Sequence, residues 1–467
     1  MRLTDRAPRR VTSVLIRDVR RLENLERAWN VIQRNGRASK SESVKSEIEA
    51  FAQDAPNKIR ALQRKLSRKT FKFAPAKGIR IPKLDSRGKK TGKFRPIVLA
   101  PVESRIVQRA VLNVLLKIPG LRPYIKTPFS FGGIRGERGT QKERKERSES
   151  LSAVPAAIQA VLDEMSNGAR FVATADIRSF FTRIPKDAVT KIVSDVIQDE
   201  EMMALFRDAI DVELSNMAQL RDKAKDFPIE DIGVAQGNSL SPLLGNIILA
   251  DFDRRMNEGD CRCIRYIDDF IILAPSKRAA NARLRKATKM LAKLAMELSP
   301  EKSSKGGSSI DEGFDFLGIN ICPGAIRPGS KAQAKILNAV QATFEESLKA
   351  MRNVRHGQPF DKSLSLTSIL KRVDGMIDGW GKHYWFCNDK QIFANLDRKF
   401  SELISRYLGE YARIRHETPK EKHQMLLGVS ELQNIPREPF TYPKRAKTGV
   451  VSPIGLVSAF GHAKIGQ

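Results

Sequence analysis

The stretch CIRYIDDFIIL, from Cys263 to Leu273, places two adjacent carboxylates between two apolar arms. Both arms are rich in β-branched and aromatic residues, and two such runs around a short polar tip predict a β-hairpin. Asp268 and Asp269 form that tip. The alternative interpretation is an ordinary aspartate-rich turn without a function. A second acidic position elsewhere in the chain would help to separate the two interpretations.

Such a position follows the apolar run FVATA, within a predicted buried strand from Ala169 to Ile177 that ends at Asp176. By itself, an aspartate after a strand is more often a turn former or a helix cap than a metal ligand. Extension of a nucleic-acid strand, however, can use two Mg²⁺ ions that stabilise the entering and leaving oxygens, and Mg²⁺ prefers carboxylate ligands on rigid elements. Asp176, Asp268 and Asp269 are therefore the candidate catalytic and metal-binding carboxylates.

The overall charge of the chain points to a polyanionic partner. Its 467 residues include 83 Lys and Arg against 53 Asp and Glu, which gives a formal charge of +30 and a pI near 10.1. Nucleic acid is the usual partner of so basic a protein, although a merely soluble or ribosome-like basic protein has the same composition. An apolar content of 41% is enough for a substantial folded core.

Cysteine and histidine usage argues against a zinc site or a disulfide framework, because the four cysteines form no CxxC pair and only five histidines are present. We expect reduced cysteines, with Cys261 and Cys263 on a strand. The arginine-rich N-terminus has no apolar stretch of signal-peptide or membrane-span length. These features predict a cytoplasmic protein that does not interact with a membrane. The cysteines are Cys261, Cys263, Cys322 and Cys387.

Apolar periodicity predicts a chain of mixed helices and strands. From Phe71 to Pro101 it predicts two strands joined by a mobile basic loop (DSRGKKTGK), and residues 135–147 predict a charged loop that is either flexible or RNA-contacting. Strand character returns from Phe314 to Cys322, and beyond Thr418 we expect a proline-containing tail. The predicted helices cover residues 22–68, 103–116, from about 186, 236–256, 279–298 and most of 331–411.

Five stretches in order resemble motifs of the reverse transcriptase family over about Ile79 to Asn320. The stretch KFRPIVLAPVESRIVQRAVLNVLL resembles the fingers, ADIRSFF the first catalytic motif and AQGNSLSPLLGNI the glutamine-glycine motif. YIDD resembles the second catalytic motif, and SPEKS followed by FDFLG resembles the lysine motif and the primer grip. The order and the separations match as well, which makes the resemblance far more specific than any single motif.

The resemblance implies an α+β right-hand polymerase fold of fingers, palm and thumb, with a helical N-terminal extension and a C-terminal extension. The expected domains are a basic helical extension at 1–70, fingers and palm at 71–325, a helical thumb at 326–415 and a C-terminal extension at 416–467. The resemblance also implies that Asp176 and Asp268 bind both Mg²⁺ ions, for which Mn²⁺ is a substitute, while Asp269 and the backbone carbonyl of Ile177 assist.

Other residues take expected roles from the same resemblance. Phe181 corresponds to the aromatic gate beneath the sugar that rejects a 2′-hydroxyl, although a core aromatic beside Phe180 is the simpler interpretation. Gln236 and Gly237 correspond to contacts with the incoming nucleotide and the template, but Ala235 stands where the family usually has proline. Asn238, Ser239 and Ser241 suit helix caps equally well.

Three cations suit the triphosphate. Lys83 and Arg95 lie on the arms of the predicted fingers hairpin, and Lys302 corresponds to the basic residue near the leaving pyrophosphate. Each has surface charge as its alternative interpretation. Phe316-Leu317-Gly318 matches the primer-grip turn, where the glycine suggests a close backbone approach.

The segment DGMIDGWGKHYWF resembles the thumb of bacterial and group II intron reverse transcriptases, and its aromatics Trp380, Tyr384 and Trp385 are expected in the core first and as stacking surfaces second. The extensions resemble those of defence-associated enzymes, whose members commonly act with a cognate structured noncoding RNA. The expected partners are therefore an RNA template, dNTPs and a DNA product, with homo-oligomer formation left open.

Alternative functions are a group II intron or retron enzyme, an RNA-binding maturase-like protein, and template-independent or protein-primed DNA synthesis. The chain shows no zinc-bearing endonuclease pattern beyond the thumb and no valine-threonine-glycine thumb motif of retrons. Tyr407, Tyr411 and Tyr442 are candidate protein primers, although a tyrosine is more often a packing residue.

Overall fold

The computed structural model describes residues 14–84, 90–125, 127–133, 153–354, 356–432 and 435–441. The chain forms two compact units, one of Met1–Ala342 with Asp374–Ser405 and the other of Thr343–Val373 with Arg406–Gln467. All of the predicted site residues belong to the first unit. The charged loop expected at 135–147 and the candidate primer Tyr442 lie outside the described residues.

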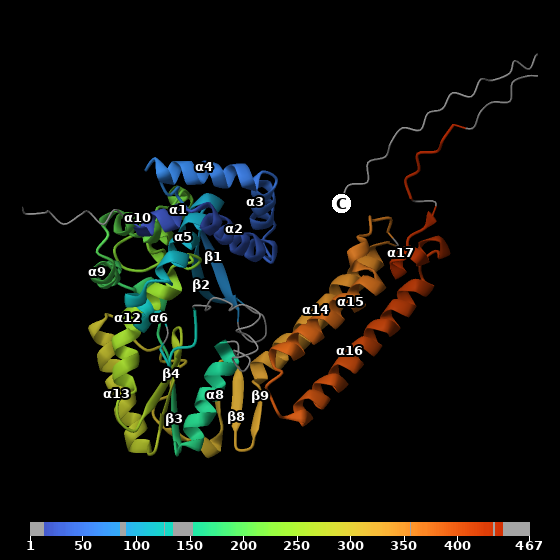
Figure 1. Ribbon diagram of the computed structural model, residues 1–467. Coiled ribbons are helices and arrows are strands. Elements are labelled where there is room, and N and C mark those ends of the chain that lie inside the picture. Colours follow the sequence, from blue (N-terminus) through green and yellow to red (C-terminus); the bar gives the residue numbers. More distant parts are fainter. Residues whose placement is uncertain are drawn as a thin grey trace, which may run out of the picture. The chain divides into compact units, whose positions relative to one another are not determined.

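Four amphipathic helices open the described chain, the last three of them within the predicted range 22–68, and the first three pack on a fifth helix, α5 (Val102–Leu115). Their apolar faces share one core with α5, in which Leu25 and Leu62 are fully buried and the Trp29 and Phe51 rings lie 4.6 Å apart. Figure 1 shows this group at one end of the first unit. The four helices are α1 (Val14–Arg20), α2 (Leu22–Arg37), α3 (Glu42–Ala52) and α4 (Ala55–Ser67).

The predicted two-stranded hairpin consists of β1 (Lys77–Leu84) and β2 (Lys90–Leu99), which pair antiparallel with an irregularity between Pro82 and Leu84. The expected loop is shorter than the sequence suggested, because Lys90 to Lys93 belong to β2, and residues 85–89 are not among those described. Arg80 stacks on the Phe94 ring at 4.0 Å, which steadies the outer part of the hairpin.

A four-stranded sheet in the order β4-β5-β3-β6 carries the acidic residues. The hairpin predicted around YIDD is formed by β4 and β5, and β5 pairs antiparallel with β3 over its whole length. Asp176 is the last residue of β3, and Asp269 is the first of β5. The strands are β3 (Phe171–Asp176), β4 (Arg262–Tyr266), β5 (Asp269–Ala274) and β6 (Ser308–Ser309).

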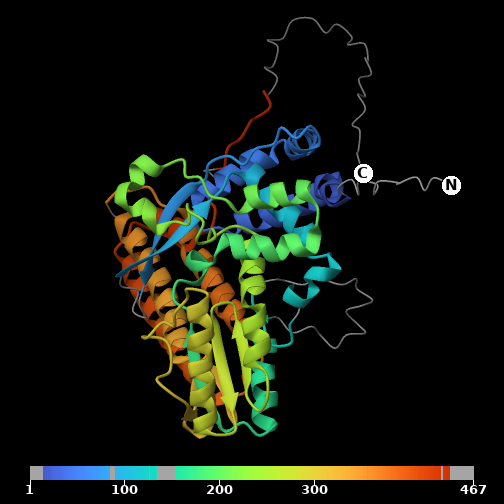
Figure 2. The same ribbon diagram turned by 90° about the vertical axis from the view of Figure 1, so that its left-hand side faces the viewer.

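Both faces of this sheet are covered. Ala173, Phe270 and Ile272 face one core with α12 (Ser241–Met256), and α13 (Lys277–Lys293) packs along the same side. Val172, Ile264, Ile271 and Leu273 face the other core, with α8 (Ala153–Ser166) and a small sheet of three strands. Figure 1 shows the strands between α13 and α8, and the turned view in Figure 2 shows α13 lengthwise along them.

Two predicted helix boundaries were wrong. The helix expected from Gln236 begins at Ser241, because Gln236 to Leu240 form a turn with Gly237 at φ +119°. The helix expected to reach Leu298 ends at Lys293, where Ala295 adopts a positive φ and Leu298 bridges to Ile177. In the first place the backbone pairs with β2 at Ile97 and Val98, and in the second it pairs with Ile177 beside Asp176.

The small sheet consists of β7 (Phe314–Phe316), β8 (Ile319–Cys322) and β9 (Ala325–Pro328). The close approach expected at Gly318 was wrong for the described residues, because nothing lies within 4 Å of the position of an added Cβ. Gly318 instead supplies a φ of +79° in the β7–β8 turn, and the tight packing occurs at Gly329, whose added Cβ would lie 3.0 Å from the Gly318 oxygen.

The long helices α14 (Ser330–Val354), α15 (Leu366–His383) and α16 (Lys390–His416) contribute residues to both units. In the second unit, the Phe344 and Tyr407 rings stack at 4.3 Å and Ser347 Oγ lies 2.9 Å from the Tyr407 hydroxyl. In the first unit Tyr384 is buried, as expected, but Trp385 is 61% exposed, which corrects its placement in the core.

The remaining elements are short or peripheral. No helix among the described residues is long and apolar enough to span a membrane. All four cysteines are free, and Cys261 and Cys263 are buried at and before β4. The other helices are α6 (Arg122–Ile125), α9 (Lys186–Ile197), α10 (Glu200–Ile210), α11 (Met217–Leu220) and α17 (His423–Leu427), with 3₁₀ turns at Pro119–Leu121, Phe180–Arg183, Arg221–Asp226, Ile310–Glu312, Lys362–Leu364 and Lys420–Lys422.

Candidate functional site

Three carboxylates meet where β3 ends and the β4–β5 hairpin turns. Asp176 and Asp269 are direct register partners, and opposite residues of an antiparallel pair project from the same face. The Ile177 N–H donates to the Asp268 carbonyl at 2.9 Å, which ties the hairpin tip to the end of β3. Ile267 adopts φ +61°, so the tip is a tight turn. The structure therefore brings Asp176, Asp268 and Asp269 together.

The carboxylates repel one another in a partly buried setting. Burial, the charges of Asp268 and Asp176, and a side-chain hydrogen bond with Asp176 raise the pKa of Asp269 to about 7. Burial also raises the pKa of Asp268, an effect that Asp176 reinforces and that Lys302 and Arg95 oppose. Such accumulated negative charge favours a bound cation or proton.

Lys302 supplies a cation to this cluster, because its ammonium Nζ lies 2.7 Å from Asp176 Oδ2. The turn that carries it is fixed to β3: the Ser299 N–H donates to the Asp176 carbonyl at 2.8 Å, and the Asp176 N–H donates to Ser303 Oγ at 3.2 Å. Burial alone would lower the pKa of Lys302, but the hydrogen bond and the charges of the three aspartates raise it. The predicted basic residue thus contacts a catalytic candidate directly.

The cations of the β1–β2 hairpin face the same cluster. Burial lowers the pKa of Lys83, and repulsion from Arg95, Lys302 and Lys93 lowers it further, while Asp176 opposes the shift. Arg95 in turn acts on Asp268. Lys93, which the sequence did not single out, pairs with Glu301 at 2.7 Å and joins the hairpin to the turn of Lys302. Lys83, Arg95 and Lys302 therefore form one positive group beside the carboxylates.

The Gln236–Gly237 turn lies against β2. The Val98 N–H donates to the Gln236 carbonyl at 3.0 Å, and an added Cβ at Gly237 would lie 2.8 Å from the Val98 oxygen. Only glycine fits this close approach at φ +119°. Without the proline that is usual in the family, the turn is closed by Ser241 Oγ, which donates to the Ala235 carbonyl at 2.7 Å.

Asn238, which was predicted as a possible cap of α12, forms other hydrogen bonds. Asn238 donates to the Ala209 carbonyl at 2.7 Å and accepts from the Leu240 N–H at 2.9 Å, and Leu240 precedes the helix without a side-chain cap. Phe181 is half-buried, with its ring 5.3 Å from that of Phe180 and its carbonyl accepting from the Val234 N–H at 2.7 Å. This placement suits a gate as well as a core aromatic.

Arg265 is the main residue that sequence reasoning missed. Its side chain is fully buried and pairs with Asp253 of α12, through Nε at 2.7 Å and through NH2 at 2.5 Å. Its NH1 donates to the Ile267 carbonyl at 2.9 Å, inside the tip that carries the aspartates. The sequence signal that could have revealed Arg265 is its place in the otherwise apolar first arm of CIRYIDDFIIL. A charged residue that is buried in this way requires a partner.

The donor set fits an open divalent site. Within the described part of the chain, no three His, Cys, Asp or Glu side chains form a preformed metal cage. Mg²⁺ at catalytic sites commonly takes one or two carboxylates together with waters and substrate phosphates. Asp176 faces Asp269, Asp268 adds charge, and the Ile177 carbonyl follows Asp176 in the chain. These oxygens could hold such an ion, while Lys83, Arg95 and Lys302 could bind a polyphosphate.

Comparisons with known proteins agree with this chemistry. A family model described as reverse transcriptase (RNA-dependent DNA polymerase) matches residues 81–321. Protein YkfC of Escherichia coli is 24% identical over 318 residues, which cover 59% of this chain and 74% of the relative. The putative COX1/OXI3 intron 2 protein of Saccharomyces cerevisiae is 24% identical over 196 residues, 42% of this chain and 19% of the relative.

Two solved structures are similar to this chain at a low level. A chain of a partial Cas6-RT-Cas1–Cas2 complex matches 60% of this chain with 18% identity and a TM-score of 0.32, and 42% of that chain is covered. Telomerase from Candida albicans, in complex with a fragment of telomeric RNA, matches 76% of this chain with 13% identity and a TM-score of 0.37, and 61% of that chain is covered. The chain thus spans less than two thirds of either structure.

Proposed function

The chain belongs to the reverse transcriptase family of RNA-dependent DNA polymerases, and on that premise we propose that it extends a DNA strand from dNTPs on an RNA template at the Asp176, Asp268 and Asp269 site. The observation that carries this proposal is the pairing of Asp176 with Asp269 across β3 and β5, with the Ile177 N–H bound to the Asp268 carbonyl. Three carboxylates fixed by backbone pairing form a rigid anionic site beside three cations.

The residues divide the work of nucleotide transfer. Two Mg²⁺ ions, when bound by the aspartates and the Ile177 carbonyl, would activate the 3′-hydroxyl and stabilise the charge that develops on the leaving oxygen. Arg95 and Lys83 bind the triphosphate, and Arg95 can do so bidentately. Lys302 leaves its contact with Asp176 and neutralises the leaving pyrophosphate. The turn of Gln236 and Gly237 contacts the incoming nucleotide and the template.

Phe181 is proposed to lie beneath the sugar of the incoming nucleotide. Phe181→Ala should therefore raise the use of rNTPs relative to dNTPs by roughly 10- to 100-fold, because the space that rejects a 2′-hydroxyl opens. Single-nucleotide addition with each substrate measures this ratio. Phe180→Leu, which changes the neighbouring core ring, is the control. An unchanged ratio of rNTP to dNTP use in Phe181→Ala would show that Phe181 is a core residue and not a gate.

Carboxylate dependence tests the main proposal. Purified protein with its co-purified RNA, dNTPs and Mg²⁺ should make DNA complementary to that RNA, while Asp268→Asn/Asp269→Asn should make none. Asp195→Asn, an exposed residue of α9, is the matched control. Sequencing of the product decides between mechanisms: a homopolymer or random product would favour template-independent synthesis, and no product under any metal condition would favour an RNA-binding role alone.

We further propose that the template is a cognate structured noncoding RNA and that synthesis serves bacterial antiviral defence. The formal charge of +30 supports a polyanionic partner such as a structured RNA. Removal of the gene, or Asp268→Asn/Asp269→Asn in its place, should increase phage sensitivity in the native host. Unchanged sensitivity in both strains would argue instead for an intron-type enzyme, which the yeast intron protein favours.

Protein priming receives no support from the described tyrosines. Tyr407 is 1% exposed and its hydroxyl lies against Ser347, and Tyr411 is also buried. Burial raises the pKa of both phenols, which opposes formation of a nucleophilic phenolate. Template-directed synthesis is therefore the better proposal than synthesis primed from either residue.

A further inference from the structure

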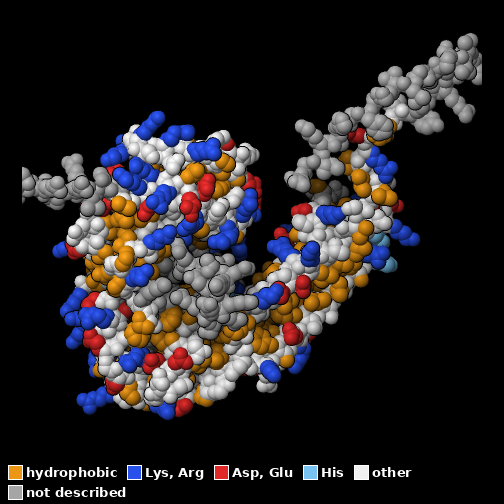
Figure 3. Space-filling view, viewed as in Figure 1, with side chains coloured by type: hydrophobic (Ala, Val, Ile, Leu, Met, Phe, Trp, Pro, Cys, Tyr) orange, Lys and Arg blue, Asp and Glu red, His pale blue; other side chains and the backbone are white. Residues whose placement is uncertain are grey.

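A basic groove lies outside the catalytic site, between the C-terminal end of α12 and α13. Its volume is about 450 Å³, and five of its seven lining residues are cations: Arg255, Arg285, Lys286, Lys289 and Lys293. No acidic residue lines it. Figure 3 shows Lys and Arg side chains projecting from this edge of the first unit. Concentrated charge of one sign in a concave surface raises the local concentration of counter-ions.

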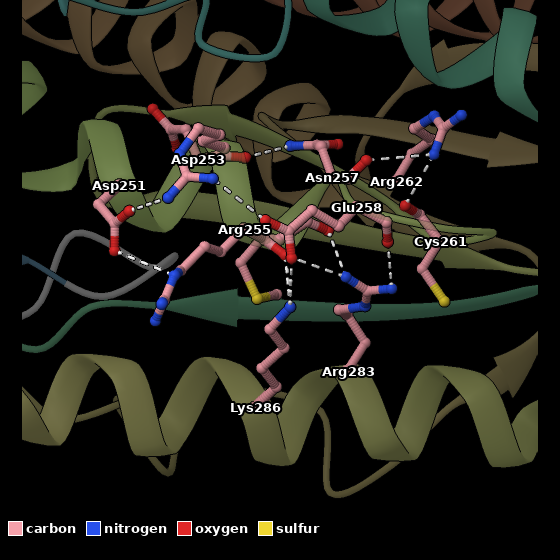
Figure 4. Close-up of polar contacts among 11 residues, drawn as sticks. Asp251, Asp253, Arg255, Asn257, Glu258, Cys261, Arg262, Arg283 and Lys286 are labelled. Atoms are coloured by element: carbon pink, nitrogen blue, oxygen red, sulfur yellow. Dashed lines mark hydrogen bonds and ion pairs between the residues drawn. The ribbon is translucent and has the colours of Figure 1, made fainter.

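Part of the groove is held rigidly by the helices themselves. Lys286 Nζ donates to the Arg255 carbonyl at 2.6 Å, and Arg283 donates to the Met256 carbonyl at 3.1 Å and the Glu258 carbonyl at 2.6 Å. Figure 4 shows Arg283 and Lys286 of α13 directed at the end of α12. These bonds complement the negative end of the α12 dipole and fix the spacing of the two helices.

The five lining cations differ in whether they have acidic partners. Arg255 and Lys286 pair with Asp251 and Glu258, each at 3.4 Å. Arg285, Lys289 and Lys293 are exposed, and none of them forms an ion pair with another residue in the described ranges. They recur every four residues, so successive charges rise by about 6 Å along one face of α13. This face presents a row of charges that is available to a ligand.

The row points away from the catalytic centre. Leu284, Ala287 and Leu291 form the buried face of α13, which packs on the central sheet, and the groove residues occupy the opposite face of the same helix. Asp176 and Asp269 alternate with Ala175 and Phe270, which face the α12 core, and so project from the other side of the sheet. The groove and the three aspartates therefore lie on opposite sides of the central sheet.

We propose that the α12–α13 groove binds the sugar-phosphate backbone of a folded RNA, as a second contact separate from the primer–template site. Arg285 can grip a phosphate bidentately, while Lys289 and Lys293 act as point charges along the strand. A groove lined mostly by cations suits the phosphates of a nucleic-acid backbone, and such contacts carry no base-sequence information. The identity of the polyanion as RNA rests on the proposed function, and the groove itself does not.

The test compares two triple variants of equal charge change in the full chain. Arg285→Gln/Lys289→Gln/Lys293→Gln removes the row from the groove. Arg60→Gln/Arg64→Gln/Arg68→Gln removes three exposed arginines with the same spacing, two on α4 and one at its C-terminal cap, none of which lines the α12–α13 groove. A charge-preserving variant, Arg285→Lys/Lys289→Arg/Lys293→Arg, reports whether charge alone suffices. Unchanged thermal melting shows that each variant is folded.

Binding of a labelled RNA hairpin is measured while a short primer–template duplex in excess occupies the catalytic site. The groove variant should bind about 10-fold or more weakly, with the salt dependence of log Kd reduced by about 2 to 3 because three phosphate contacts are lost. The α4 variant and the charge-preserving variant should stay within about 2-fold of wild type. Nucleotide addition to the short duplex should be unchanged in all of them.

Three results would overturn the groove proposal: no weakening in the groove variant, an equal weakening in the α4 variant, or an equal loss of nucleotide addition to the short duplex. A duplex DNA of the same length distinguishes RNA from the DNA product, and equal weakening for DNA would assign the groove to product instead. Wild-type protein that binds the hairpin but never makes DNA would contradict the proposed function. The groove proposal would still be tested by the difference in hairpin binding between wild type and the groove variant.

Discussion

Arg265 lies on β4 and supports the turn that carries Asp268 and Asp269. It is fully buried, paired with Asp253, and bound to the Ile267 carbonyl in the turn before Asp268. Ile267 has a positive φ, which costs energy for a β-branched residue unless surrounding contacts hold it. The ion pair therefore serves to position the aspartates, and it does so from the α12 side of the sheet.

Substitutions of Arg265 and Asp253 should affect the stability of the fold and the rate of nucleotide addition differently. Arg265→Met leaves the Asp253 charge buried and unpaired, which should lower the free energy of unfolding by about 3–5 kcal/mol. Arg265→Met/Asp253→Leu removes both charges and should recover most of that loss. Nucleotide addition should stay roughly 10-fold or more below wild type in the double variant, because the Ile267 carbonyl still lacks its donor. Urea unfolding and single-turnover kinetics measure the two effects.

Full recovery of nucleotide addition in the Arg265→Met/Asp253→Leu variant would mean that Arg265 contributes only stability. Arg265→Lys is the conservative control: it keeps the charge but has one ammonium in place of the guanidinium fork, so it should preserve more stability than activity.

Asp269 should give the metal-free protein a distinct pH dependence. Its folded pKa of about 7 lies above the ordinary value of 3.8. Between these values the folded state holds a proton that the unfolded chain has lost, so stability falls as pH rises through this window and levels off above it. In EDTA, the melting temperature of Asp269→Asn should match wild type near pH 4 and exceed it by about a few degrees at pH 8.

Asp195→Asn provides the comparison for this effect and should follow wild type at both pH values. Addition of Mg²⁺ at pH 8 should narrow the gap, because a cation relieves the repulsion that destabilises the wild-type site. A constant difference between wild type and Asp269→Asn across the pH range would show that Asp269 titrates normally.

At the scale of elements, the site depends on the contact between the β1–β2 hairpin and the turn before α12. The hairpin brings Lys83 and Arg95 to the carboxylates, and two links hold its base and its arm: the Val98 N–H to the Gln236 carbonyl, and Lys93 to Glu301. The ion pair is exposed and should contribute little to stability. The backbone contact at Gly237 is the tighter constraint.

A matched pair of glycine substitutions isolates that contact. Gly237→Ala combines a φ of +119° with an approach of 2.8 Å to the Val98 oxygen, whereas Gly168→Ala has a φ of +107° in open space. Gly168→Ala should cost about 1 kcal/mol from backbone strain alone. Gly237→Ala should cost about 1–3 kcal/mol more and raise the KM for dNTPs, because the hairpin must shift. An equal loss of unfolding free energy in Gly237→Ala and Gly168→Ala would show that β2 can shift away from the turn without cost.

At the scale of the whole molecule, the charge of +30 should dominate affinity for RNA. Asp268→Asn/Asp269→Asn should still bind RNA tightly, since the proposed catalytic residues are acidic and electrostatic binding of RNA uses cations. A plot of log K against log salt should have a slope of about −5 or steeper, which reflects release of counterions from several phosphates. A slope near zero would contradict an extended basic surface.

The local parts of this design could be predicted from the sequence. Alternation of period two and apolar residues at helical spacing placed the YIDD hairpin, the strand that ends at Asp176, the N-terminal helices and α5, because these patterns depend on neighbours in the chain. Prediction failed where a helix begins later than expected, after Gln236, and where a helix ends earlier than expected, before Ala295. In both places the backbone pairs with residues far away in the sequence, Val98 and Ile177.

The sequence by itself determined which residues could carry the chemistry: aspartates at a strand end and a hairpin tip, cations in the fingers, and a basic chain. Only the tertiary structure decided that Asp176 pairs with Asp269, that Lys302 contacts Asp176, that Arg265 and Asp253 position the tip, and that a row of cations on α13 faces away from them. The physical reason is that strand register and ion pairing follow from which faces are buried together, and distant segments settle that jointly when they pack.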